Sequence, residues 1–206
     1  MSYIKNVLIK NLTISGLESG VDAVLGDNIT TVLSIDYYES IFEPVFEFQI
    51  RFISNEGVLS DSKLRGTERV NLEIQHQSGT LEFENLVLTS FIQNESESTA
   101  TSFTIKVNPE SVVNNLKERC VKRYDPKVKT SSHVENILKF NIKEIKDEML
   151  DIEETANSDG FFGNYWPPFK AIYWLARRAV SGSMPEDGGG SDRVGFLFWM
   201  TKTGYK

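Results

Sequence analysis

The feature that most constrains the fold of this 206-residue chain is a strict alternation of apolar and polar residues between Phe46 and Phe52. The apolar positions are Phe46, Phe48, Ile50 and Phe52, and the polar positions between them are Glu47, Gln49 and Arg51. Successive side chains of a β-strand point to opposite faces of its sheet, so this pattern predicts a strand with one face on a core and the other in water. The aromatic segment before it carries Glu39 and Glu43, which predicts an acidic turn leading into the strand.

The first half of the chain contains strand and turn signals throughout. Segments rich in β-branched and aromatic residues, bounded by glycine, asparagine and serine, predict strands at Tyr3–Leu8, Ile29–Tyr37, Val45–Ile53, Val70–Gln75, Leu81–Gln93 and Ser102–Val107. Short strands at such regular spacing are typical of a small antiparallel barrel or sandwich.

The pattern changes at Asn108, where helix signals begin. Asn108 is suited to cap a helix that starts at Pro109, and a second helix is predicted from Ser131 or Ser132. The third predicted helix, residues 167–182, has Ile172, Leu175, Ala176 and Ala179 on one face. A strand at residues 194–201 and a hairpin at Thr203-Gly204 follow, and we expect the polypeptide to continue beyond Lys206 because a strand without its partner exposes an unpaired edge.

Charge is distributed unevenly between these two halves. Residues 1–107 hold 7 basic and 15 acidic residues, whereas residues 108–206 hold 15 basic and 14 acidic residues. We therefore predict an α+β chain with two domains, residues 1–107 and residues 108–206. The acidic first half is unsuited to nucleic acid, because phosphate contacts require basic groups.

No segment predicts a membrane span, a secretory signal or a disulfide. The longest apolar runs fall short of the roughly 20 residues that cross a bilayer, and the N-terminus lacks a continuous apolar core. Cys120 is the single cysteine. We interpret it as a packed thiol on a helix face shared with Val113 and Leu116.

Signature motifs of hydrolases, nucleotide-binding proteins, metalloproteases and EF-hands are absent from the sequence. His76 and His133 fall in different halves and are interpreted as exposed polar residues. The carboxylates between Asp147 and Glu154 are interpreted as a solvated face, with a metal site or hydrolase pair as the alternative. The segment 185–193 is rich in acids and glycines but lacks the ligand spacing of a calcium loop. We therefore assign no catalytic, cofactor-binding or metal-binding residue.

Two further clusters leave alternatives open. The basic run comprises Lys117, Arg119, Lys122, Arg123, Lys127 and Lys129. It is interpreted as a surface for an acidic partner or another copy, with a solvated helix and nucleic acid as alternatives. The aromatic segment Phe161–Trp174 is interpreted as the anchor of the third helix, with a sugar-binding platform as the alternative.

Read in order, these pieces resemble the N-terminal portion of the central baseplate hub protein of contractile-tailed bacteriophages. The resemblance rests on ITTVLSIDYYESIFEPVFEFQIRF as the early strand–turn–strand, GTERVNLEIQH as the next strand, and SVVNNLKERCVKRYDPK as the helix leading out of the first domain. SSHVENILK and NYWPPFKAIYWLARRAV with VGFLFWMT are similar to its later helices and strand.

The resemblance implies an antiparallel β-barrel hub domain followed by an α/β helix–strand domain. It also implies a non-enzymatic homotrimer, whose ring adapts the sixfold tail tube to the threefold central spike. The expected partners are the tail spike and the tail tube or baseplate proteins, with no cofactor, no membrane and no direct nucleic-acid contact. The expected location is the virion tail baseplate after assembly in the host cytoplasm, and the hub of a related contractile injection machine fits equally.

The alternative function is a carbohydrate-binding or cell-wall-acting virion module. It would use Phe161–Trp174 as a platform and carboxylates from Asp147–Glu154 as acid and base. This alternative predicts that Trp166 and Tyr173 are exposed in a groove, whereas the hub function predicts that they are largely buried.

Overall fold

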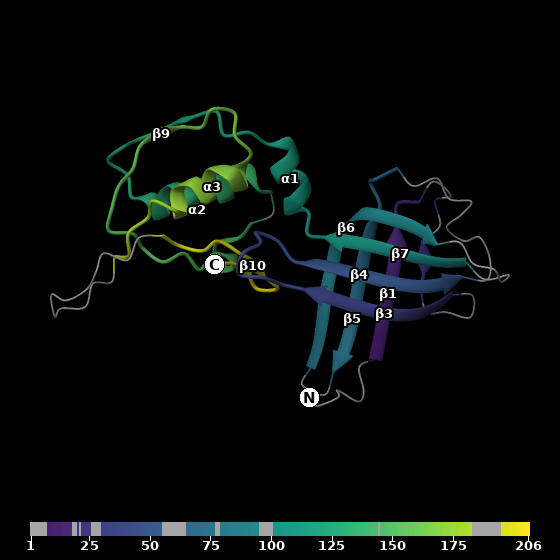
Figure 1. The fold of residues 1–206 in the computed structure, drawn as a ribbon. Helices are drawn as coiled ribbons and strands as arrows, with labels where there is room; N and C mark the ends of the chain where they lie inside the picture. The colour runs from purple at the N-terminus through teal and green to yellow at the C-terminus, as the bar shows by residue number, and fades with distance from the viewer. Residues whose placement is uncertain are drawn as a thin grey trace. The chain divides into compact units, whose positions relative to one another are not determined.

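The computed structural model describes residues 8–17, 20, 22–25, 30–54, 65–76, 79–94, 101–143, 145–182 and 195–206. The chain divides into two compact units, which we call the sheet unit (residues 1–38 and 47–110) and the helical unit (residues 39–46 and 111–206). The predicted α+β class is confirmed, since the described residues form mostly antiparallel sheet together with three α-helices (Figure 1). Within the described residues, no helix is long and apolar enough to cross a membrane.

The sheet unit is built from seven antiparallel strands in the order β2-β1-β5-β6-β7-β4-β3. The strands are β1 Leu8–Ser15, β2 Ala23–Val24, β3 Thr30–Tyr38, β4 Glu47–Ser54, β5 Arg69–His76, β6 Gly79–Asn94 and β7 Thr101–Asn108. Every neighbouring pair of strands runs antiparallel. Such pairs are joined by hairpins or longer loops and need no helical crossover connection.

The long strand β6 bends the sheet. Its first half pairs with β5 as far as Val87, and its second half pairs with β7 from Val87 onward. Register shifts lie at Val70/Leu72 in the first ladder and at Leu88/Ser90 in the second. Since bulges increase local twist, they curl the sheet into a half-barrel (Figure 1).

The alternation of apolar and polar residues predicted between Phe46 and Phe52 is confirmed in β4. Phe48, Ile50 and Phe52 are buried, and the Phe48 ring lies 4.8 Å from the ring of Phe83. On the opposite face Lys106 Nζ lies 2.8 Å from Glu47 Oε1. A single period-2 pattern therefore separates the aromatic core of the sheet unit from its solvated surface.

Five of the six predicted strands are confirmed to within two residues at each end. The exception is Tyr3–Leu8, because β1 runs from Leu8 to Ser15 and residues 3–7 lie outside the described residues. A register shift between Ile9 and Asn11 breaks the simple alternation, so the buried side chains of this strand are Leu12 and Ile14. The two-residue strand β2 was not predicted.

The helical unit consists of short elements. The helices are α1 Ser111–Lys117, α2 Thr130–Asn141 and α3 Pro168–Ala176, with a 3₁₀ turn at Asp147–Met149. Two-residue strands form the pairs β8 Arg123–Tyr124 with β9 Phe161–Phe162 and β10 Met200–Thr201 with β11 Gly204–Tyr205. Helices α2 and α3 pack against each other (Figure 1).

Helix α3 buries Ile172, Leu175 and Ala176, as its predicted apolar face requires, and Ala179 just beyond its end is buried too. The hairpin predicted at Thr203-Gly204 is confirmed by the pairing of β10 with β11. The strand predicted at 194–201 is only two residues long. The N–H groups of Gly195 and Phe196 donate instead to carbonyls at the end of α3, so they are not available to a strand ladder.

Candidate functional site

The carboxylates between Asp147 and Glu154 do not converge on one point. Asp147 pairs with Lys139, and Asp151 lies 2.9 Å from Lys206. Glu154 pairs with Lys129, and this cation lowers the pKa of the Glu154 carboxyl. In the part of the chain that the structure describes, no group of three or more histidine, cysteine or acidic residues is arranged to hold a metal. The acid- and glycine-rich segment 185–193 lies outside the described residues.

His133 is buried, so its predicted exposed role is wrong. Its Nε2 lies 3.0 Å from the carbonyl oxygen of Asp125, and its ring packs edge-on against Tyr124 at 5.3 Å. Because Tyr124 and the loop after it fold over the start of α2, the side chain loses contact with solvent. His133 therefore ties the β8 region to α2 and is not placed to act as a general base.

Cys120 is a packed thiol, as predicted, but it does not lie on a helix. Helix α1 ends at Lys117, and the N–H of Cys120 donates to the carbonyl of Trp166 at 2.9 Å. The side chain is buried, and burial raises the pKa of the thiol. Since the reactive form of cysteine is the thiolate, Cys120 is poorly suited to nucleophilic chemistry.

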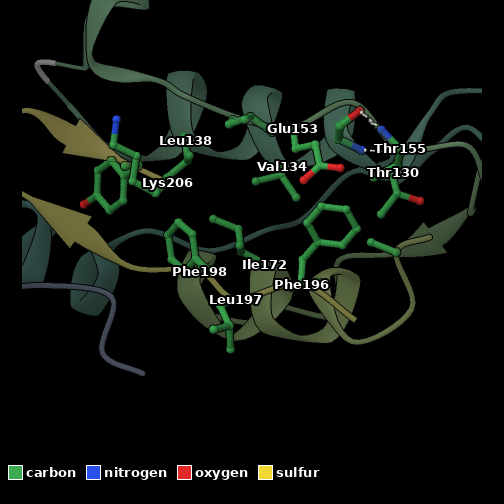
Figure 2. A pocket seen from close by; sticks show the side chains of 15 residues that line it. Thr130, Val134, Leu138, Glu153, Thr155, Ile172, Phe196, Leu197, Phe198 and Lys206 are labelled. Carbon is green, nitrogen blue, oxygen red and sulfur yellow. Dashed lines mark hydrogen bonds between the residues drawn. The ribbon is translucent and has the colours of Figure 1, made fainter. Parts of the chain in front are cut away.

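The helical unit encloses a small apolar cavity. Figure 2 shows Val134 and Leu138 of α2 facing Ile172, Phe196 and Phe198 across it. Its volume is about 50 Å³, far below the roughly 300 Å³ at which small-molecule sites begin. The cavity is therefore a packing void in the core of the unit rather than a ligand site.

The segment Phe161–Trp174 serves mainly in packing. The Phe161 ring stacks on Tyr124 at 4.2 Å and lies 5.3 Å from the Trp174 ring. Trp166 and Tyr173 are half-buried, so they are not exposed in a groove, and their burial is closer to the large burial that the hub function predicted. The Tyr173 hydroxyl donates to the carbonyl of Phe42 at 3.2 Å, so its polar end is also used within the unit.

In the helical unit residues 119–124 run beside residues 161–166 and Asn141, and this region exposes both cations and apolar side chains. We call the exposed residues of these segments and of the adjoining end of α1 the basic–aromatic face; they are Lys117, Arg119, Lys122, Arg123, Leu116, Val121, Phe140, Phe162 and Tyr165. All of these side chains are exposed, Phe140 at 72% and Tyr165 at 75%. The basic residues come from the run noted in the sequence, whereas the apolar residues were not predicted to be exposed, and Leu116 was predicted to face inward.

Alternation in β8 and β9 produces this face. Tyr124 and Phe161 point inward and stack, so their neighbours Arg123 and Phe162 point outward, with the Arg123 guanidinium 5.6 Å from the Phe162 ring centre. Next to them, Lys122 Nζ lies 4.4 Å from the ring centre of Phe140, which belongs to the last turn of α2. These cation–π contacts connect residues of three elements into one surface.

A strained turn beside Cys120 exposes Tyr165. The chain passes so close to Cys120 that a Cβ on Gly163 would lie 2.1 Å from the Cys120 carbonyl oxygen. Asn164 and Tyr165 follow with φ values of 49° and 56°, and the N–H of Trp166 closes the turn on the carbonyl of Gly163 at 2.8 Å. A left-handed conformation at a bulky residue costs on the order of 1 kcal/mol or more and is concentrated at functional positions.

The four cations of this face form no ion pair with a carboxylate among the residues that the structure describes. Elsewhere in the unit, Lys139 pairs with Asp147 and Lys206 with Asp151. Exposed aromatic residues and arginine are enriched at protein–protein interfaces, and contiguous exposed apolar surface marks such sites. The basic–aromatic face is therefore the candidate functional site.

No protein-family model matches the sequence, and no curated protein matches it. Among solved structures, the 43 kDa tail protein of prophage MuSo2 from Shewanella oneidensis is similar with a TM-score of 0.52 and 11% identity, over 95% of this chain and 52% of that one. This chain is similar in fold to a phage tail protein.

Two other solved structures are similar at lower scores. One is the E. coli c3393 protein, described as a component of the type VI secretion system with structural similarity to the T4 bacteriophage tail proteins gp27 and gp5 (TM-score 0.43, 12% identity, 84% of this chain and 43% of that one). The other is a tail protein from Neisseria meningitidis MC58 (TM-score 0.44, 9% identity, 81% and 44%). The chain spans about half the length of these structures.

Proposed function

We propose that this chain is a structural, non-enzymatic subunit of a phage tail or of a related contractile injection machine. The observation that carries the proposal is the similarity in fold to a phage tail protein over 95% of the chain. The sequence supports it independently, because the order of its strands and helices resembles that of the baseplate hub family.

Within the tail, the proposed role is that of the baseplate hub. In the family that the sequence resembles, each subunit supplies two similar barrels, so three subunits present a pseudo-sixfold ring between tail tube and spike. The curled half-barrel of the sheet unit provides one such wall. The proposed assembly is a homotrimer that contacts the tail tube or baseplate proteins on one side and the spike on the other.

The distribution of polar groups supports a role without catalysis. Cys120 and His133 are buried in packing contacts, and the carboxylates of Asp147–Glu154 pair with different partners. Cys120 and His133 are therefore not placed to act as an exposed nucleophile or base, and these carboxylates do not form a convergent pair.

Carbohydrate binding remains the second candidate, and one observation favours it. Phe162 and Tyr165 expose their rings, as a sugar platform requires. Phe161, Trp166 and Trp174 instead pack against one another, so the platform would be limited to two side chains.

Gold-labelled antibody against this chain, applied to purified tail particles, tests the proposed location. Label confined to the distal end of the tail is expected, since the hub lies where the tube meets the spike. Label along the whole tail or on the capsid would contradict the hub role, and absence of the chain from the particles would contradict the tail role altogether.

A further inference from the structure

The outer surface of the sheet unit carries a cluster of carboxylates that we call the acidic face. Glu73 of β5 lies directly opposite Glu82 of β6, and Glu84 is two residues further along β6 on the same side. Like charges directly opposite each other destabilise a sheet, so this arrangement costs stability in the isolated unit. None of the three carboxylates has an ion-pair partner within the described part of the chain, and Glu82 and Glu84 are exposed.

The acidic face is hollowed. Glu73, Glu82 and Glu84 line a hollow of about 280 Å³ together with the amide side chains of Asn11 and Asn71. A hollow walled by carboxylate and amide oxygens is suited to the guanidinium or ammonium group of an arginine or lysine side chain, because these groups are donors only.

The basic–aromatic face has the complementary chemistry. Lys122, Arg123 and Phe140 line a hollow of about 260 Å³ whose wall also includes Asp125. Neither Lys122 nor Arg123 forms an ion pair with Asp125 or with any other carboxylate among the described residues. The two faces are therefore opposite in charge, and on each of them the charged side chains are unpaired within the described residues. Such complementarity fixes register and excludes wrong partners at an interface.

We propose that the basic–aromatic face of one copy of this chain binds the acidic face of a second copy. Lys122 and Arg123 lie against Glu82 and Glu84, which relieves the carboxylate repulsion across β5 and β6. Phe140, Phe162 and Tyr165 surround these ion pairs and exclude water from them. Because the two surfaces differ, the contact is heterologous, and a contact of this kind closes into a ring when its rotation is one-third of a turn. This inference rests on the proposed function, because the contact would be the subunit interface of the proposed ring.

Charge reversal and restoration in the full chain test this contact. The first variant carries Lys122→Glu and Arg123→Glu, the second carries Glu82→Lys and Glu84→Lys, and the third carries all four changes. All four changes are placed in one chain because a mixture of the first two variants cannot satisfy every contact of a three-membered ring. Lys127→Glu with Lys143→Glu is the control, since it changes the net charge as much as the first variant does, at exposed positions outside the face.

Sedimentation equilibrium over a range of protein and salt concentrations gives the dissociation constant of each variant, and circular dichroism verifies that each is folded. The wild-type chain and the control are expected to associate, more weakly at high salt. The first and second variants are expected to bind at least tenfold more weakly, and the third is expected to recover most of the loss.

Three outcomes would overturn the inference. In one, the wild-type chain stays monomeric; in another, the first and second variants associate as tightly as the wild type; in the last, the folded third variant associates as weakly as the first two. If the wild-type chain stays monomeric and the first variant loses affinity for duplex DNA, the basic–aromatic face binds nucleic acid instead. Label at the distal end of the tail would uphold the proposed place in the tail in each of these cases, so failure of this interface can be told apart from failure of the tail role.

Discussion

The sheet unit holds its backbone in strands of up to 16 residues, whereas the strands of the helical unit are two residues long. In the sheet unit each ladder repeats the same hydrogen bonds and places Phe48, Ile50 and Phe52 on one face. In the helical unit individual bonds, such as that from Cys120 to Trp166, carry the connections between elements. The sheet unit is thus stabilised by regular strand pairing and an aromatic core. The helical unit is stabilised by close contacts between irregular segments.

This difference determines which substitutions each unit tolerates. A change in the sheet unit acts through the volume of a core side chain, because the backbone is held by many equivalent bonds. A change in the helical unit acts at single points where backbone meets backbone, such as Gly163 on Cys120 and Gly204 on Met149. The tryptophans all belong to the helical unit, so their fluorescence reports on that unit alone.

The largest effect is expected for Phe48→Ala in the sheet unit. Phe48 is 1% exposed and packs on Tyr37 and Phe83, so its truncation leaves a cavity and costs about 3–5 kcal/mol of unfolding free energy. Urea unfolding followed by far-ultraviolet circular dichroism measures the loss. Phe42→Ala is the control, because Phe42 is 69% exposed and its truncation is expected to change stability by less than about 0.5 kcal/mol. A loss under about 1 kcal/mol for Phe48→Ala would contradict the aromatic core described here.

A smaller but clear effect is expected for Gly163→Ala in the helical unit. The added Cβ would meet the Cys120 carbonyl at 2.1 Å, so two segments must separate, at a cost of roughly 1–3 kcal/mol. Tryptophan fluorescence during urea unfolding measures this loss. The matched change Asn164→Gly relieves a positive φ in the same turn and is expected to be neutral or stabilising. Equal destabilisation by both changes would show that the turn is not held by this close approach.

Alkaline pH is expected to destabilise the helical unit more than the sheet unit. Burial raises the pKa of Cys120, Tyr124 and Tyr205, all in the helical unit. Below the ordinary thiol and phenol pKa values of about 8.5 and 10 both states are protonated, and above them the unfolded chain releases protons that the folded chain retains. Stability is therefore full below this range and falls as the pH rises through it. In the sheet unit Glu47 raises the pKa of Lys106, so this ion pair also loses stability as the pH rises. Its effect is small, because both side chains are partly exposed and water screens the pair.

Unfolding free energies measured by tryptophan fluorescence at a series of pH values from neutral to alkaline check this expectation. The same pH series followed by far-ultraviolet circular dichroism, whose signal comes mainly from the strands, gives the stability of the sheet unit for comparison. A fluorescence-detected stability that stays constant through the phenol range would contradict the burial of these groups.

The smallest effect is expected for Tyr205→Phe. The Tyr205 hydroxyl is buried and has no hydrogen bond of normal geometry among the described residues, so its removal is expected to be neutral or to stabilise the helical unit by up to about 1 kcal/mol. Thermal unfolding followed by fluorescence measures the change. A clear loss of stability would show that the hydroxyl is satisfied by a partner outside the described residues.

The sequence predicted the sheet unit well, because period-2 alternation is a local signal and the buried face of β4 repeats it. It failed at β1, where a register shift between Ile9 and Asn11 interrupts that signal. The sequence also predicted that α1 would extend to Cys120, but the helix ends at Lys117. The N–H of Cys120 instead donates to the carbonyl of Trp166, 46 positions further along the chain. Contacts between distant segments leave no local pattern.

The candidate site was predicted only in part. The cations of the basic–aromatic face were visible as a run, but their apolar companions were not. Phe162 points outward only because Phe161 stacks on Tyr124, and Phe140 is exposed because it lies on the outer side of the last turn of α2. His133 shows the converse, since a residue expected at the surface is buried by a loop that folds over it.

We propose that three copies of this chain form a ring. Light scattering behind size exclusion gives the absolute mass of the full chain over a wide concentration range. A particle of three times the chain mass is expected at the higher concentrations. A stable dimer, or a monomer at every concentration, would contradict a ring built from this chain.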